Sequence, residues 1–135
     1  MTDATFNLSI CLKIETEENI DFITDVLNLR PTDLIKKGER KSRVLDAAES
    51  NIWIYDVKYG DCKNIEGKIS EFLDGIPQLF QKTKDLERIG TVTIRISIVS
   101  DFAQLGVGFS KKDLSLLSGL QIPIEISVLS WGQCT

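Results

Sequence analysis

Four stretches of this chain alternate apolar and polar residues with a period of two, and this alternation constrains the fold more than any other feature. They span residues 6–14, 51–59, 91–99 and 122–128. The clearest reads TVTIRISIV, in which every second residue is a valine or an isoleucine. Successive side chains of a strand point to opposite faces of its sheet. The pattern therefore predicts strands that bury one face and leave the other more polar.

The first of these strands is followed by a predicted helix from Glu17 to Leu27. Its apolar residues return at the three-residue spacing of a helix, and Thr16 is placed as its N-cap. Asn28 can supply a left-handed C-terminal cap, because asparagine tolerates that conformation. Pro31 then forbids further helix and turns the chain away.

Helical spacing appears again later in the chain. The remaining predicted pieces are a helix over residues 65–76, a short helix beginning at Pro77, a short strand over residues 106–109, and a helix capped by Ser110 and ended by Gly119. Residues 33–50 show no clean period and are predicted to be a loop with short extended pieces.

The order of these segments predicts one α+β domain over residues 1–135. Polar outer faces indicate a mostly antiparallel sheet with helices packed on one face. The expected topology is a ferredoxin-like theme, built on a split βαβ unit. Pro123 near the start of the last strand indicates either a sheet edge or merely the start of a strand. If this strand lies at an edge, it could pair across a homodimer.

Charge and hydropathy exclude several classes of protein. The formal net charge is -4, which argues against binding nucleic acid through the whole surface and permits a basic partner. The apolar-rich stretches, residues 91–99 and 122–129, are too short to span a membrane. Residues 1–7 are polar and lack the apolar core of a signal peptide, so we expect a cytoplasmic protein.

The residue types that most often carry catalysis are missing or scattered. The chain has no histidine, so Ser-His and Cys-His nucleophile pairs cannot form within it. The cysteines, Cys11, Cys62 and Cys134, match no zinc or redox spacing, and Cys11 is expected to be a small buried apolar residue. The acidic residues form no ligand cluster. The sequence therefore predicts a non-catalytic protein with no metal and no cofactor.

The first predicted helix carries a candidate surface for a protein partner. Glu17, Asp21 and Asp25 are spaced by four, which would place their carboxylates on one helical face. Like charges at this spacing weaken a helix, so a retained stripe could be a docking surface for a basic partner such as a nuclease toxin. The other interpretation is a solvated face that keeps the protein soluble.

The segment after this helix concentrates positive charge in an acidic chain. Its basic residues are Lys36, Lys37, Arg40, Lys41 and Arg43. They could hold an anionic ligand, although the segment has no Walker-type glycine pattern and no interleaved aromatic residues. The other interpretation is a solvated connector that pairs with the neighbouring acidic helix.

A small pocket could also form around this segment. Its rim would consist of Pro31, Thr32, Lys37, Gly38, Arg40 and Trp53. A structural interpretation competes with it: Pro31 and Thr32 set a turn, Gly38 supplies an unusual backbone angle, and Trp53 packs in the core.

Several of these residues also carry a family resemblance. The shared pattern comprises the run LNLRPT at residues 27–32, Lys37 with Gly38, the strand bearing Trp53, and a leucine-rich last helix with Leu114 and Leu117. In this pattern the chain resembles domain-of-unknown-function family 4279, a set of small, mostly bacterial single-domain proteins. Asn28 stands where glycine is usual in that family, and Ile35 where an aromatic residue is expected. The resemblance covers nearly the whole chain and implies no assigned activity.

These observations support the hypothesis of a non-catalytic, cytoplasmic protein that binds another protein. Some small families of this kind neutralise toxins, so by analogy we expect an immunity-type role. Binding would use the acidic helix or an exposed face of the sheet. The alternative is a small-ligand-binding or regulatory module that uses residues 31–43.

Overall fold

The structure is a computed structural model that describes residues 6–40, 46–62, 64–102 and 107–133. Five strands and four helices lie within these residues. Their order is β1 (Phe6–Thr16), α1 (Asp21–Leu27), β2 (Asp33–Ile35), β3 (Asn51–Cys62), α2 (Ile65–Asp74), α3 (Pro77–Glu87), β4 (Gly90–Phe102), α4 (Lys111–Leu120) and β5 (Ile124–Gln133).

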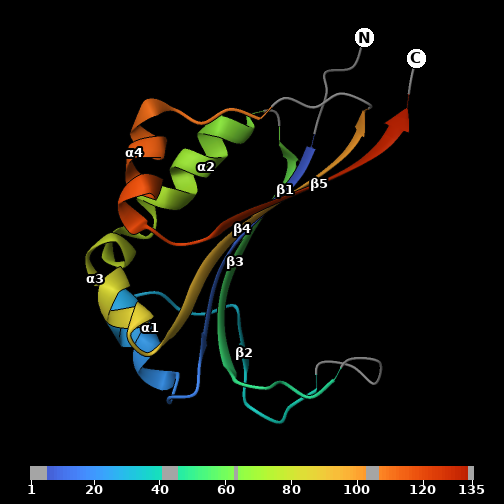
Figure 1. The fold of residues 1–135 in the computed structure, drawn as a ribbon. Coiled ribbons are helices and arrows are strands. Elements are labelled where there is room, and N and C mark those ends of the chain that lie inside the picture. Colours follow the sequence, from blue (N-terminus) through green and yellow to red (C-terminus); the bar gives the residue numbers. More distant parts are fainter. Residues whose placement is uncertain (1–5, 41–45, 63, 103–106, 134–135) are drawn as a thin grey trace.

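The strands form one sheet in the order β2-β3-β1-β4-β5. β1 lies at the centre and pairs antiparallel with β3 on one side and with β4 on the other. β2 pairs antiparallel with β3, whereas β5 pairs parallel with β4. Figure 1 shows the helices against one face of a curved sheet, whose other face is uncovered and concave. The predicted α+β class and mostly antiparallel sheet are confirmed.

The ferredoxin-like theme is not confirmed. A split βαβ unit leaves a strand between its two parallel strands. Here α4 joins β4 to β5, and the two strands are direct neighbours from the pair Ile94↔Ile124 to the pair Ser100↔Ser130. This βαβ unit is therefore unsplit, and β5 lies at the sheet edge, one of the two positions that Pro123 indicated.

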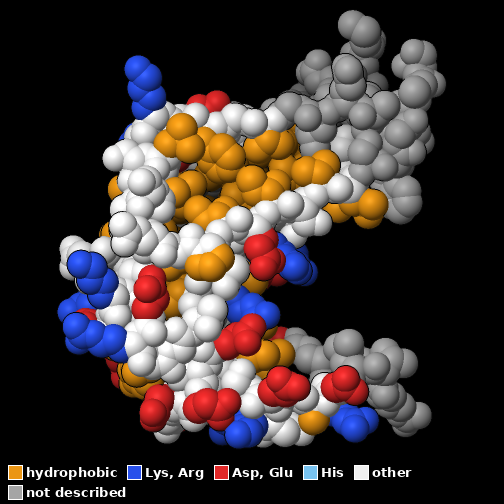
Figure 2. Space-filling model, in the orientation of Figure 1, with side chains coloured by type: hydrophobic (Ala, Val, Ile, Leu, Met, Phe, Trp, Pro, Cys, Tyr) orange, Lys and Arg blue, Asp and Glu red, His pale blue; other side chains and the backbone are white. Residues whose placement is uncertain are grey.

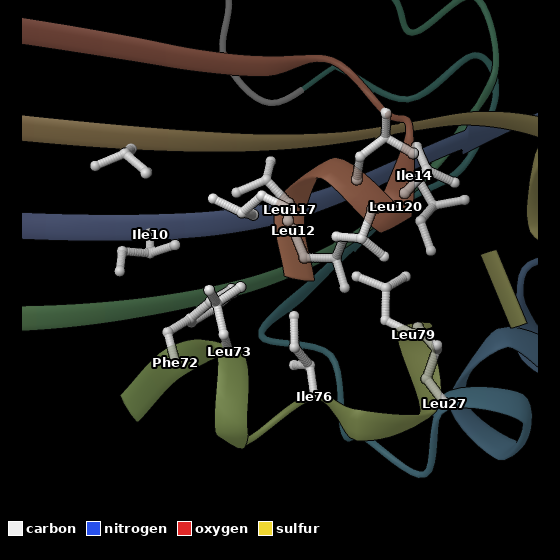
Figure 3. Close-up of a cluster of buried hydrophobic side chains, with 14 of the residues drawn as sticks. Ile10, Leu12, Ile14, Leu27, Phe72, Leu73, Ile76, Leu79, Leu117 and Leu120 are labelled. Atoms are coloured by element: carbon white, nitrogen blue, oxygen red, sulfur yellow. The ribbon is translucent and has the colours of Figure 1, made fainter. Parts of the chain in front are cut away.

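The alternation within β1 determines which face of the sheet is buried. Leu8, Ile10, Leu12 and Ile14 are at most 2% exposed, and the residues between them are partly exposed. The buried set points toward the helices. Figure 3 shows it meeting apolar side chains of α1, α2, α3 and α4 and of their connections, including Leu27, Phe72, Leu73, Ile76, Leu79, Leu117 and Leu120. Burial of each such side chain contributes about 1.5–3 kcal/mol.

Local capping explains where several helices begin. Asn64 accepts a hydrogen bond from the Gly67 N–H at 2.9 Å and caps α2, and Pro77 occupies the first turn of α3. The Ser110 side chain accepts from the Asp113 N–H at 3.1 Å, so its predicted role as the N-cap of α4 is confirmed.

Two predicted helix boundaries are wrong. β1 continues to Thr16 and α1 begins only at Asp21, so Glu17 lies before the helix. Pairing with strands on both sides keeps the chain extended to that point and overrides the local capping signal. α4 continues past Gly119, and Gln121 takes the left-handed conformation with φ 54°.

Cys11 does not lie in the core as expected. The alternation that buries Ile10 and Leu12 places Cys11 on the uncovered face, where it is partly exposed. Its apolar character alone therefore predicted the wrong environment.

The connecting segments agree with the prediction only in part. β2 is a short extended piece within the predicted loop. Residues 107–109 form no strand, and Gly106 lies outside the described residues. In the part of the chain that the structure describes, no helix is long and apolar enough to cross a membrane.

Alanine substitution at adjacent positions of β1 tests the assignment of the two faces. We expect Leu12→Ala to lower the free energy of unfolding by about 2–5 kcal/mol, because it opens a cavity among buried side chains. Lys13→Ala should lower it by less than about 1 kcal/mol, because the lysine side chain is only partly buried and its ion pair with Glu15 is open to solvent. Urea unfolding followed by circular dichroism measures both, and equal losses would contradict the assignment.

Candidate functional site

The uncovered face gathers polar and charged side chains from neighbouring strands. The register places Cys11 of β1 between Asp56 of β3 and Arg95 of β4. Arg95 in turn lies beside Glu125 of β5. Figure 2 shows this face as the hollow at the right of the molecule, with acidic and basic side chains along its wall. The row therefore crosses most of the width of the sheet.

Two ion pairs join neighbouring side chains on the described part of this face. Two guanidinium nitrogens of Arg95 lie 2.9 and 3.0 Å from a Glu125 carboxylate oxygen. Lys13 Nζ lies 2.7 Å from a carboxylate oxygen of Glu15. These groups are well exposed, so each pair contributes less than about 1 kcal/mol to stability.

Shallow depressions hollow the face. One of about 200 Å³ is lined by Cys11, Lys13, Glu15, Thr93, Arg95 and Glu125. Another of about 250 Å³ is lined by Asn7, Leu8, Ser9, Lys58, Tyr59, Gly60, Ser97 and Val99. A depression of about 270 Å³ has both Glu15 and Glu17 in its wall. The uncovered face is thus continuous with the acidic segment before α1.

The Cys11 thiol lies in the middle of this face and is held in its protonated form. Partial burial raises the pKa of Cys11 and the Asp56 carboxylate raises it further, while Lys13 and Arg95 act in the opposite direction. Ser9 Oγ donates to Asp56 at 2.7 Å and so fixes that carboxylate. The thiolate is the reactive form of cysteine, so Cys11 is a poor nucleophile at neutral pH.

Removing the neighbouring negative charge should make Cys11 more reactive. In Asp56→Asn we expect the pKa of Cys11 to fall, because the thiolate no longer faces a carboxylate, whereas the amide oxygen can still accept from Ser9. Alkylation of Cys11 by iodoacetamide, followed by peptide mass spectrometry across pH, should then begin at lower pH. Asp85→Asn in α3, on the helix side, is the matched control. An unchanged pH profile in Asp56→Asn would contradict the proposed influence of Asp56.

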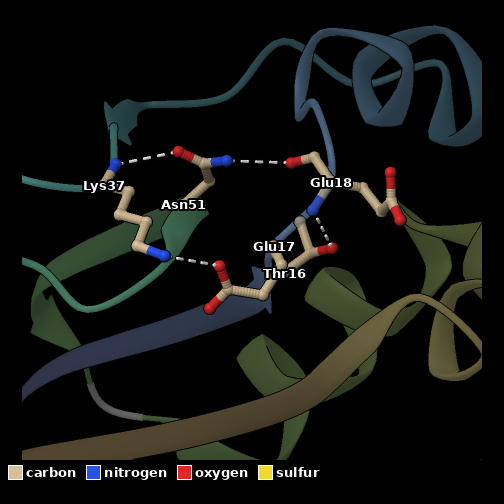
Figure 4. Close-up of polar contacts among 5 residues, drawn as sticks. All are labelled: Thr16, Glu17, Glu18, Lys37 and Asn51. Carbon is tan, nitrogen blue, oxygen red and sulfur yellow. Dashed lines mark hydrogen bonds and ion pairs between the residues drawn. The ribbon is translucent and has the colours of Figure 1, made fainter.

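The predicted acidic stripe is divided in the structure. Asp21 and Asp25 are exposed on α1, but Glu17 lies in the turn between β1 and that helix. Glu17 Oε2 accepts from Lys37 Nζ at 3.0 Å, as Figure 4 shows. One member of the stripe is therefore already bound to the basic segment.

A chain of hydrogen bonds extends this ion pair to the end of β1. Asn51 Oδ1 accepts from the Lys37 backbone N–H at 2.8 Å, and its Nδ2 donates to the Glu18 carbonyl at 2.9 Å (Figure 4). The Glu18 N–H donates to Thr16 Oγ1 at 3.0 Å. Asn51, at the start of β3, thus ties the basic segment to the acidic turn.

The basic segment beyond Lys37 turns back on itself. Gly38 has φ 92°, a conformation that favours glycine, and its N–H donates to the Ala48 carbonyl at 2.9 Å. Arg40 is exposed. Lys41 and Arg43 lie outside the described residues.

The other residues of the predicted pocket rim pack against β3. The Thr32 N–H donates to the Ile54 carbonyl at 2.8 Å, directly after the half-buried Pro31. Trp53 is 0% exposed, and its indole N–H donates to Thr24 Oγ1 at 3.2 Å. A fully buried indole cannot line an open pocket, so its position supports the structural interpretation of Trp53.

The sequence of the whole region matches a known family. Residues 4–131, nearly the whole chain, match the family described as Domain of unknown function (DUF4279). The chain belongs to this family. No curated protein and no solved structure matches it.

Asn28 and Ile35 are the two positions of this DUF4279 chain at which the resemblance led us to expect other residue types. Asn28 caps α1 in the left-handed conformation, with φ 53° and its N–H bonded to the Thr24 carbonyl. Glycine adopts that conformation without strain, so a glycine at this position would serve equally well. Ile35 is half-buried in β2, opposite Ile52 of β3.

Sequence reasoning missed the row of Asp56, Cys11, Arg95 and Glu125 in this DUF4279 domain. The period of two assigns each residue to a face of its own strand. It does not tell which strands are neighbours or how their registers align. The polar positions of each alternating stretch show which side chains share a face of one strand. Without the strand order they do not show which polar side chains of different strands lie side by side.

Asn51 is expected to matter more for stability than the ion pair beside it. Asn51→Ala removes bonds to two backbone groups and should lower the free energy of unfolding by about 1–2 kcal/mol. Lys37→Ala removes only the exposed ion pair and keeps the backbone bond to Asn51, so the loss should be below about 1 kcal/mol. Urea unfolding measures both variants. A larger loss in Lys37→Ala would contradict this ranking.

Proposed function

We propose that this DUF4279 domain is a non-catalytic protein-binding protein that receives its partner on the uncovered concave face of the sheet. The observation that carries this proposal is the placement of the helices. They cover one face and leave the other open, where a row of side chains from β3, β1, β4 and β5 is held in register.

The shape of the face supports a protein partner. A concave sheet can surround a convex surface and exclude water from its polar groups, and the depressions of about 200 and 250 Å³ can receive side chains of that surface. The charges already pair within the face, so a partner would not have to bury an unpaired Arg95 or Glu125.

The charge of the surroundings supports a basic partner. The formal net charge of the chain is -4. At one end of the face Glu15 and Glu17 line the same depression, and the exposed acids Glu18, Asp21 and Asp25 follow closely in the sequence. In Figure 2 acidic side chains gather along the lower end of the molecule. Such a field speeds the approach of a basic protein. The proposed role is of immunity type, in which the domain neutralises a basic toxin in the cytoplasm.

The raised pKa of Cys11 is consistent with binding rather than nucleophilic chemistry on this face. The small-ligand alternative at residues 31–43 has less support, because Lys37 is engaged by Glu17 and Trp53 is buried. A thermal-shift screen with nucleotides and small anions tests that alternative. If the alternative holds, a ligand should raise the melting temperature, and Arg40→Ala should abolish that rise.

Bulky substitutions on the open face test the main proposal. The wild-type domain is immobilised on a resin and incubated with an extract of its source organism. It should retain a basic protein, which mass spectrometry then identifies. Binding of that protein should weaken at least tenfold in Thr93→Arg with Ser97→Arg, because both side chains lie on the depressions. Calorimetric titration of the purified partner measures the loss.

The matched control is Gln81→Arg, which adds a positive charge at an exposed position of α3 on the helix side. Its binding should equal that of the wild type. Full binding by the open-face variant would overturn the proposal. Reversing Glu17, Asp21 and Asp25 to lysine tests the acidic segment separately, and undiminished binding in that variant would remove the segment from the interface.

A further inference from the structure

The two edges of the sheet differ in how well they are protected. β2, at one edge, has three residues and is followed by Lys36 and Lys37. β5, at the other, has ten residues and within the described sheet is paired with β4 alone. Proteins guard exposed edges by making them short or charged, and an unguarded edge is a template for another strand.

The β5 edge is also apolar on its helix side. Ile126 and Val128, on the helix side, are each 49% exposed, and Leu129, on the open side, is 50% exposed. Beside them Leu114 of α4 is 53% exposed, and a groove of about 380 Å³ runs between α4 and β5. Figure 2 shows a broad apolar patch in the upper part of the molecule, where Figure 1 places α4 and β5.

We propose that β5 pairs antiparallel with β5 of a second copy of this chain, which makes a two-fold symmetric dimer with one continuous sheet. Two identical edges related by a two-fold axis meet antiparallel, so each copy gives and receives the same contacts. The proposal does not depend on the proposed function, because the uncovered face stays open in such a dimer.

Side-chain pairing favours a register centred on Ser127. In that register Ile126 lies opposite Val128 of the second copy, and the pair occurs twice. Both residues are on the helix side, so the buried apolar row of the sheet continues across the two-fold axis. Because the axis stands perpendicular to the sheet, both α4 helices lie on that side, and the exposed Leu114 side chains flank the new pairs.

Charge supports the same register. Glu125 is the single charged residue in the sequence of β5, and Arg95 already binds it at 2.9 Å. With Ser127 at the centre, the two Glu125 residues lie four residues apart along the paired strands, roughly 13 Å at a rise of about 3.3 Å per residue. This separation exceeds the screening length of about 8 Å at physiological salt. A register centred on Glu125 would instead set the two carboxylates opposite each other.

Self-pairing accounts for the edge better than addition of a strand from a different protein. A foreign strand would need apolar residues that match Ile126 and Val128 on the helix side. The second copy supplies these residues from its own Val128 and Ile126. On the open side the register sets Leu129 opposite Glu125 of the second copy, whose carboxylate stays bound to Arg95.

Mass measurement of edge variants tests the dimer. At about 50 μM, light scattering after size exclusion should give twice the chain mass for the wild type, and the monomer mass for Ile126→Lys with Val128→Lys. Leu34→Lys places a lysine on the exposed β2 edge and should remain dimeric. A monomeric wild type would overturn the proposal, as would a dimer that survives the β5 substitutions.

A cross-link tests the register independently of any loss of folding. With the three native cysteines replaced by serine, Ser127→Cys should oxidise to a disulfide-linked dimer, because facing strand residues have Cα atoms about 4.5–5.5 Å apart, within disulfide reach. Glu125→Cys in the same background should stay unlinked, because its counterpart lies too far along the strand. Equal cross-linking at both positions, or none at Ser127→Cys, would contradict the register.

Discussion

The pairing of β1 on both of its sides is the constraint on which the rest of this structure depends. β1 joins β3 and β4 over nearly its whole length, so its alternation is imposed on the sheet centre. Leu8, Ile10, Leu12 and Ile14 then require a cover, and the helices supply it. The same alternation directs Ser9, Cys11, Lys13 and Glu15 to the other side.

Covering only one face of a curved sheet has two consequences for binding. It leaves a concave polar face whose groups are ordered by strand register, and it leaves β5 incompletely covered where α4 passes beside the edge. The two surfaces differ in chemistry: one is charged and internally paired, and the other is apolar with open backbone groups. The two proposed interfaces are therefore separate, and the proposed dimer would leave the concave face free.

Much of the fold could be predicted, because its signals are local. The alternating stretches became β1, β3, β4 and β5, and Asn28, Pro77 and Ser110 have the capping roles that their residue types indicated. The candidate site could be predicted far less well. The acidic stripe assumed a helix at Glu17, but strand pairing keeps that region extended, and Lys37 reaches it from a segment distant in the sequence. Cys11 was predicted to be buried from its apolar type. Its position in the alternation of β1 instead places it on the uncovered face.

The sequence by itself determined the periodicity of each strand, the ends of several helices and the lack of histidine chemistry. These properties follow from the residue types and from their spacing within one helix or one strand. Only the tertiary structure decided that β5 runs parallel to β4 at an edge, that Asp56, Cys11, Arg95 and Glu125 share one row, and that Asn51 joins Lys37 to the acidic turn. Such contacts join residues distant in the chain, and a strand's period is the same whichever neighbour it pairs with.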